Sequence, residues 1–120
     1  MARGTHRLVS LVPGLSDVVR YGLAYLDAYG IETEVTSAGR TSAEQRRLYE
    51  LYKAGRGNPA ASPGTSAHEY GLAVDVSSIY GSRHQHQQYV IAVFRWLGLA
   101  TPYPHEPWHF EVPDWRRYVR

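Results

Sequence analysis

Apolar positions in the first quarter of the chain are spaced as on one face of a helix. Between residues 15 and 30, Val19, Leu23 and Leu26 fall at i, i+4 and i+7, which predicts an amphipathic helix. Ser16 is typical of a residue that caps the start of a helix, and Gly30 of one that follows the end. The preceding residues, 1–14, are expected to form an N-terminal arm.

Helical spacing returns twice further along the chain. Residues 41–55 begin with Thr41 and Glu44 in the positions of a capping box, and Gly55 follows the last turn. The buried face of this helix is expected to consist of Leu48, Leu51 and Tyr52. A third helix is predicted over 84–98, with apolar residues at i, i+3, i+4 and i+7, namely Val90, Val93, Phe94 and Leu97.

Three stretches between the helices alternate apolar and polar residues as strands do. They are 32–39, 71–78 and 108–112, and Pro113 with Asp114 opens a last helical turn over 113–120. The segment 55–65 is rich in Gly, Pro and Ser and is predicted to be a loop. Because helices and strands are mixed without regular βαβ alternation, we expect one α+β domain over 1–120.

Composition narrows the possible partners and sites. The chain has 120 residues, 43% of them hydrophobic, and no apolar run long enough for a membrane span or a signal peptide. We therefore expect synthesis in the cytoplasm. The net charge of +2 mildly favours anionic partners. Because no nucleic-acid motif is present, we do not expect nucleic acid to be one of them. We expect the protein to be a monomer. The chain has no cysteine, so any metal must be held by His, Asp or Glu.

A carboxylate in the middle of the second predicted strand suggests a metal site. Leu72, Val74 and Val76 share one face of this strand, so Asp75 lies on the other, and a buried carboxylate needs a compensating cation. His68 just upstream and His109 on the third strand would complete a set of three ligands with one position left for water, as in catalytic zinc sites.

Two further residues fit the chemistry of such a site. Glu106, three residues before His109, would act as the base that deprotonates the attacking water, and Arg40 would stabilise the oxyanion that forms. Simpler interpretations remain open for each residue taken alone. Asp75 could pair with an arginine, Glu106 could be a solvated loop residue, His105 is a competing ligand, and the ligand set would also accept cobalt or nickel.

The spacing of these residues resembles a known family. The pattern S-x-H-x-x-G-x-A-x-D from Ser66 to Asp75, followed by E-x-W-H from Glu106 to His109, is similar to that of zinc peptidases that cleave peptidoglycan. This family includes VanY-like D-Ala-D-Ala carboxypeptidases, D-Ala-D-Ala dipeptidases and phage L-alanyl-D-glutamate endopeptidases (peptidase M15). The stretch TSAGRTSAEQ, with Arg40, also resembles the arginine segment of the family.

The resemblance implies a fold and roles for individual residues. The fold is a small α+β domain with a central antiparallel sheet and flanking helices, as in D-Ala-D-Ala peptidases and Hedgehog-type domains. His68, Asp75 and His109 match zinc ligands, Glu106 the catalytic base, and Arg40 a contact to substrate or transition state. Ser66 matches a residue that lines the site and binds substrate, although Ser66 could also only cap a turn.

The candidate residues and the family resemblance are compatible with three functions. We expect a zinc-dependent peptidase that acts on peptidoglycan stem peptides in the bacterial cell wall, with a phage-type endolysin that cuts the L-alanyl-D-glutamate bond as the first choice. Such an enzyme would serve phage or prophage release or be carried on a virion. The alternative is a D-Ala-D-Ala carboxypeptidase or dipeptidase. A remote alternative is a non-catalytic zinc-containing binding module, against which Glu106 argues, since a structural site needs no base.

Overall fold

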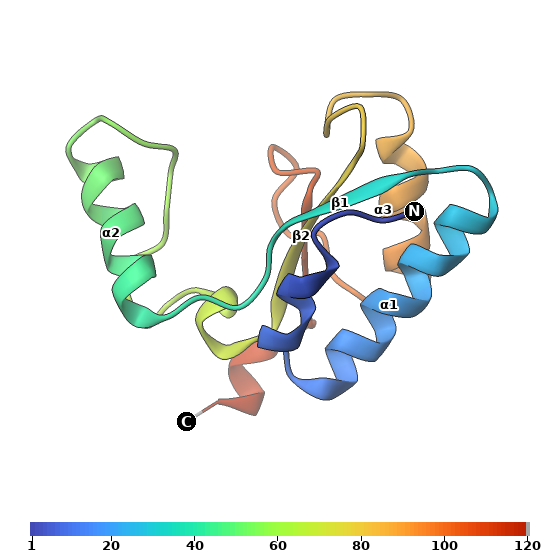
Figure 1. Ribbon diagram of the computed structural model, residues 1–120. Coiled ribbons are helices and arrows are strands. Elements are labelled where there is room, and N and C mark those ends of the chain that lie inside the picture. The colour runs from blue at the N-terminus through green and yellow to red at the C-terminus, as the bar shows by residue number, and fades with distance from the viewer. Residues whose placement is uncertain (120) are drawn as a thin grey trace.

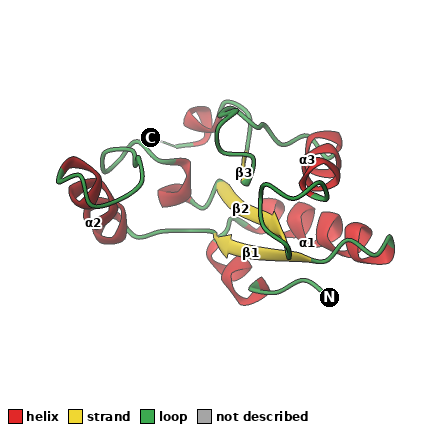
Figure 2. Ribbon diagram, turned by 90° about the horizontal axis from the view of Figure 1, so that it is seen from above, coloured by secondary structure: helices red, strands yellow, loops and turns green. Residues whose placement is uncertain are grey.

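The fold is built on an antiparallel sheet, as the computed structural model of residues 1–119 shows (Figures 1 and 2). Within these residues the sheet has the strand order β1-β2-β3, formed by Thr33–Ser37, Ala73–Ser78 and His109–Glu111. The α-helices are α1 (Pro13–Ala28), α2 (Ser42–Lys53) and α3 (Gln87–Trp96), and the 3-10 helices are η1 (Thr5–Ser10), η2 (Ala67–Tyr70) and η3 (Trp115–Tyr118). The predicted α+β class with a central antiparallel sheet is confirmed.

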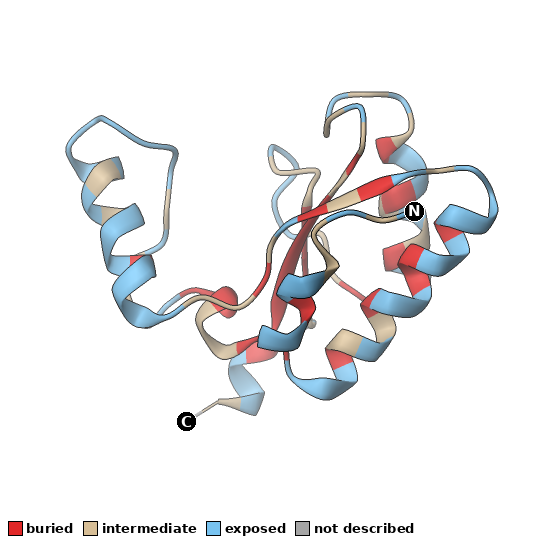
Figure 3. Ribbon diagram, in the orientation of Figure 1, coloured by how far each residue is buried: buried red, intermediate tan, exposed pale blue. Residues whose placement is uncertain are grey.

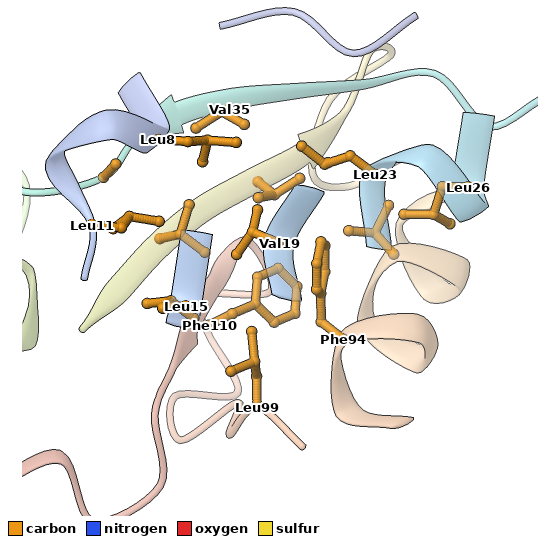
Figure 4. Close-up of a cluster of buried hydrophobic side chains, with 14 residues drawn as sticks. Leu8, Leu11, Leu15, Val19, Leu23, Leu26, Val35, Phe94, Leu99 and Phe110 are labelled. Atoms are coloured by element: carbon orange, nitrogen blue, oxygen red, sulfur yellow. The ribbon is translucent and has the colours of Figure 1, made fainter. Parts of the chain in front are cut away.

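The hydrophobic core lies between the sheet and the helices α1 and α3, which lie side by side on one face of it (Figures 1 and 4). The rings of Phe94 and Phe110 are fully buried there, with centroids 5.0 Å apart. Other members of the core come from η1, α1 and the strands, among them Leu8, Leu11, Leu15, Val19, Leu23, Leu26, Val35, Val74 and Val76. Since β2 turns its valines toward the helices, Asp75 lies on the opposite face of the sheet.

Helix α2 stands away from this core, and most of its surface is exposed (Figures 1 and 3). The predicted capping box is present, since the Thr41 side chain accepts from the Glu44 backbone and the Glu44 side chain from that of Thr41. The predicted buried face is wrong, however. Leu48 is 38% and Tyr52 41% exposed, and Leu51 is half-buried, because α2 stands away from the core that the sheet forms with α1 and α3.

Two other helices start at residues that differ from the prediction. Helix α1 begins at Pro13, whose fixed φ suits the first turn, so Ser16 lies inside the helix and its Oγ accepts from Arg20 Nε. Helix α3 begins at Gln87, after a turn. The predicted helical turn over 113–120 is found as η3, and its last residue, Arg120, lies outside the described residues.

The N-terminal segment is an integral part of the fold. Its helix η1 buries Leu8 completely, and Arg3 forms a parallel bridge with Glu34 at the edge of β1. No helix of the described chain combines the length and the apolarity that a membrane span requires.

Candidate metal centre

Two of the three predicted ligands face each other across neighbouring strands. In the antiparallel pairing of β2 and β3, Asp75 lies directly opposite His109, and Val74 opposite Phe110. The alternation that buries Val74 and Phe110 in the core therefore places Asp75 and His109 together on the other face. Both are nearly inaccessible, at 7% and 6% exposed, so their polar atoms need partners within the protein or a bound ion.

The third predicted ligand, His68, lies on η2, immediately before β2. The side chain of Ser66 caps this helix by accepting from the His68 backbone N–H at 3.3 Å, and Gly71 ends it with φ +69°. Gly71 is needed for a second reason, because a Cβ there would lie 2.9 Å from the carbonyl oxygen of Ser10. The tight turn places His68, 3% exposed, against Asp75.

The three side chains converge on one point. His68 Nε2 lies 3.1 Å and His109 Nδ1 3.2 Å from the same oxygen, Oδ1 of Asp75, and one ligand atom from each residue lies within 4.8 Å of the others. Atoms that bind a tetrahedral zinc ion at 2.0–2.1 Å are separated from one another by about 3.3 Å. The spacing and the chemistry of these donors therefore fit a metal ion of this size.

The outer nitrogens of both histidines are held by buried acceptors. His68 Nδ1 donates to the carbonyl of Ala38 at 2.6 Å, and His109 Nε2 donates to Oε1 of Glu111 at 2.8 Å. A carbonyl can only accept, so Nδ1 of His68 carries a proton, and Nε2 is the nitrogen that faces Asp75. A lone pair facing a carboxylate oxygen is repulsive unless a proton or a metal ion lies between them. This arrangement is typical of metal-ligating histidines.

The charges within the cluster shift two pKa values in opposite directions. Burial opposes ionisation of Asp75, but hydrogen bonds from His109 and His68 outweigh it and lower its pKa to about 2. Burial also opposes a charged His109, yet hydrogen bonds to Asp75 and Glu111 raise its pKa to about 9. Without a metal, His109 is therefore an imidazolium paired with two carboxylates, and a bound cation would take the place of its proton.

Arg40 approaches the cluster from the end of β1. A bulge in β1 sets Ser37 opposite Asp75, and Arg40 Nη2 donates to Ser37 Oγ at 3.1 Å and lies 3.6 Å from Asp75 Oδ2. Arg40 Nη1 donates to Oε1 of Gln45, the buried residue of α2, whose amide in turn donates to the carbonyl of Ala61. The guanidinium is thus fixed beside the cluster and is partly exposed.

Glu106 lies in the turn before β3, and its carboxylate is partly exposed. Its carbonyl accepts from the His109 backbone N–H at 3.0 Å, which joins the two residues through the main chain. Its carboxylate lies 3.5 Å from Nε2 of the exposed His105. Within residues 1–119 no hydrogen bond joins the Glu106 carboxylate to His68, Asp75 or His109, so the structure brings the three ligands and Arg40 together more tightly than it does Glu106.

Glu111 also belongs to the cluster, although the sequence motifs predict no role for it. It follows His109 by two positions on β3 and is 8% exposed. A charged residue two positions from a candidate ligand on the same strand lies on the same face as that ligand. Alternation over residues 109–111 thus places Glu111 beside His109, but it does not show that the two side chains are hydrogen-bonded.

The fold and the cluster define the class of the protein: an α+β domain with the donor set of a catalytic metal centre. The family model for VanY, described as D-alanyl-D-alanine carboxypeptidase, matches residues 23–101, and the chain belongs to this family. An enzyme of this peptidase type, predicted from the motifs, is therefore confirmed at the level of the family. No curated protein matches the sequence.

Solved structures of peptidoglycan peptidases share the fold at low sequence identity. The LD-carboxypeptidase LdcB is 21% identical with a TM-score of 0.72 over 85% of this chain, which spans 58% of that one. A mutant of the vancomycin-resistance D,D-pentapeptidase VanY, solved with Zn(II), is 23% identical with a TM-score of 0.69 over 88% of this chain and 74% of its own. The L-Ala D-Glu endopeptidase ChiX of Serratia marcescens is 24% identical with a TM-score of 0.62, and the match covers 98% and 93% of the two chains.

Proposed function

We propose that this chain is a zinc peptidase that hydrolyses the stem peptides of bacterial peptidoglycan. The observation that carries the proposal is the approach of His68 Nε2 and His109 Nδ1 to one oxygen of Asp75, at distances that suit ligands of a single ion. Membership of the VanY family and the zinc in the VanY relative support this choice of metal and substrate.

In this proposal each residue of the cluster has one task. His68, Asp75 and His109 would hold the ion, and a bound ion would supply Lewis acidity to the scissile carbonyl and to the attacking water. Glu106 accepts the proton of the attacking water and passes it to the leaving amine, which requires its partly exposed carboxylate to turn away from His105. Arg40, fixed by Ser37 and Gln45, donates to the oxygen that becomes negative.

Ser66 is proposed to contact the substrate through its hydroxyl hydrogen. Its oxygen accepts from the backbone N–H of His68, and this bond leaves the O–H free to donate to a peptide carbonyl. The cap of η2 is therefore compatible with the proposed substrate contact, since a residue that caps η2 still has a donor to offer.

The bond between L-alanine and D-glutamate is our first choice of substrate. The match to ChiX supports it, because it extends over nearly the whole of both chains. A D-Ala-D-Ala carboxypeptidase or dipeptidase is the second candidate, supported by the description of the family model. A phage-type endolysin, acting as a monomer during release or on a virion, is the setting we propose for the first activity.

Exchange of Glu106 for alanine tests the mechanism. We expect the Glu106→Ala variant to bind zinc like the wild type and to lose lysis of purified peptidoglycan. Glu50→Ala, which removes an exposed carboxylate from α2, serves as the matched control and should remain active. Full activity of Glu106→Ala would overturn the assigned base. Mass spectrometry of the digested peptides identifies the bond, because loss of terminal alanine and a new D-glutamate amine give different masses.

A further inference from the structure

A cleft of about 550 Å³ is lined by residues of η1 and α2. Helix α2 stands away from the core on this side of the molecule (Figure 1). The floor of the cleft is the chain segment from Thr36 to Arg40. One wall is η1, with His6 and Arg7, and the other is α2, with Arg47 and the partly exposed Leu48. A concave surface of this size suits a small ligand or part of a peptide.

The charge of this cleft is strongly positive. Arg7, Arg40 and Arg47 line it together with His6, while Glu44 is the one carboxylate among its lining residues. Glu44 is already engaged, since its Oε1 accepts from the Thr41 backbone N–H at 2.9 Å. Three guanidinium groups around a hollow surface attract an anion and match the planar geometry of a carboxylate.

The wall that carries Arg7 is held firmly against the floor. The Gly39 backbone N–H donates to Ser10 Oγ at 2.8 Å, and a Cβ at Gly39 would lie 2.5 Å from the Ser10 carbonyl oxygen. Leu8 and Leu11 anchor the same segment in the core. Arg7 is therefore placed in the cleft by packed structure, although it lies outside residues 23–101, which the family model matches.

Arg40 connects the cleft to the metal centre. It lines the cleft, and its Nη2 lies 3.6 Å from Asp75 Oδ2. A ligand that fills the cleft is thus separated from the candidate metal ligands by one side chain. A peptide bound at the metal centre can reach the cleft with a neighbouring residue.

We infer that Arg7 and Arg47 bind a carboxylate of the peptide substrate in this cleft. The inference rests on the proposed function. Both candidate reactions place a free carboxylate on the residue that follows the scissile bond. This is the α-carboxylate of a D-glutamate linked through its side chain, or the terminal carboxylate of D-alanine. Either carboxylate would be held by the arginines while Leu48 contacts aliphatic atoms of the peptide.

Initial-rate kinetics with the zinc-loaded protein test this inference. The substrate is a free stem pentapeptide, compared with one version amidated at the D-glutamate α-carboxylate and one amidated at the C-terminus. The variants are Arg7→Gln and Arg47→Gln, and Arg46→Gln is the matched control, because Arg46 lies on the same helix but does not line the cleft.

We expect Arg7→Gln and Arg47→Gln to raise KM about three- to tenfold with kcat nearly unchanged, while Arg46→Gln behaves like the wild type. The amidated peptide that removes this difference identifies the bound carboxylate. A KM for Arg47→Gln equal to that for Arg46→Gln, or a difference that persists on both amidated peptides, would overturn the inference. If the wild type cleaves no bond, the proposed function fails, and the Kd of the intact peptide for the same zinc-loaded proteins decides the inference separately.

Discussion

The helices α1 and α2 have similar apolar spacing and opposite surroundings. In α1, Val19, Leu23 and Leu26 are buried against the sheet, whereas in α2 Leu48 and Tyr52 are more than a third exposed (Figure 3). The apolar face of the sheet is occupied by α1 and α3, and its other face carries the metal centre. The spacing thus predicts a helix, but the available partner surface decides whether its apolar side is buried.

The two regions are also held together differently. The core region is stabilised by apolar packing, while the side chains of α2 are joined to the rest of the domain by hydrogen bonds of Gln45 with Arg40 and of Ser42 with Glu69. Hydrogen bonds of this kind contribute about 1 kcal/mol each, less than the burial of one large side chain. Because α2 is attached less tightly, there is space for the cleft lined by Arg7, Arg40 and Arg47. We also expect substitutions in the core region to lower the free energy of unfolding more than substitutions in α2.

The largest difference is expected between Phe94→Ala and Leu48→Ala. Phe94 is fully buried in the core, so its truncation should lower the free energy of unfolding by about 3–5 kcal/mol. Leu48→Ala removes a partly exposed side chain and should cost less than about 1 kcal/mol. Urea denaturation of both variants measures the effects, and equal losses would show that α2 is packed as tightly as the core.

A second prediction concerns the metal centre on the core region. Glu111→Gln keeps an acceptor for His109 Nε2 but removes the charge that makes the histidine a stronger ligand. We expect zinc affinity to fall about tenfold to a hundredfold, as measured by competition with a chelator. Glu50→Gln on α2 is the control. Unchanged affinity of Glu111→Gln would mean that Glu111 only fills space beside His109.

The metal-free protein should lose stability as the pH rises. The folded-state pKa of His109, about 9, exceeds its ordinary value of 6.5, so its stabilising contribution is complete below pH 6.5 and disappears as the pH rises through 9. Asp75 affects stability at acidic pH. Its folded-state pKa of about 2 is below the ordinary value of 3.8, so its contribution to the stability of the folded protein is lost as the pH falls from 3.8 toward 2. Between pH 6.5 and 9 we expect a loss of roughly 2–3 kcal/mol in urea denaturation with a chelator present.

Two comparisons check this pH dependence. His109→Asn should abolish the loss between pH 6.5 and 9, and zinc should reverse the trend, because its ligands must be deprotonated. A metal-free wild type equally stable at both pH values would contradict the assigned ion pairs of His109.

The smallest global effect is expected at the cap of α2. Thr41→Ala removes the acceptor for the Glu44 backbone N–H and should destabilise the helix by about 1 kcal/mol. Because α2 stands apart, hydrogen exchange should accelerate in α2 while global unfolding changes by less than about 0.5 kcal/mol. Arg46→Ala, on the exposed surface of the same helix, is the control. Slower global refolding or a large drop in overall stability would contradict the independence of α2.

Local rules predict most of the elements but not their partners. Periodicity and capping residues gave the strands and the approximate extent of the helices, and the capping box of α2 is present. The predicted start of α3 at residue 84 is too early, because residues 84–86 form a turn that alternation and spacing do not reveal. The exposure of Leu48 depends on which surface faces α2, and that is a tertiary property.

For the candidate site too, the sequence predicts which residues take part but not how tertiary packing brings them together. Strand alternation predicted that Asp75 leaves the core face, and the motifs selected His68 and His109 as its companions. That His109 lies opposite Asp75 depends on strand register, which is fixed by the packing of Val74 and Phe110 and not by sequence separation. Arg7 belongs to the predicted N-terminal arm, and tertiary contacts place it beside the cleft, namely the burial of Leu8 and Leu11 and the hydrogen bond between Ser10 and Gly39.

The metal content of purified variants tests the central claim most directly. We expect about one zinc ion per chain in the wild type and in His105→Ala, and loss of the metal in His68→Ala, Asp75→Ala and His109→Ala, all with far-ultraviolet circular dichroism like that of the wild type. Zinc retained at wild-type affinity by the three ligand variants, or a wild type that binds none, would contradict this claim.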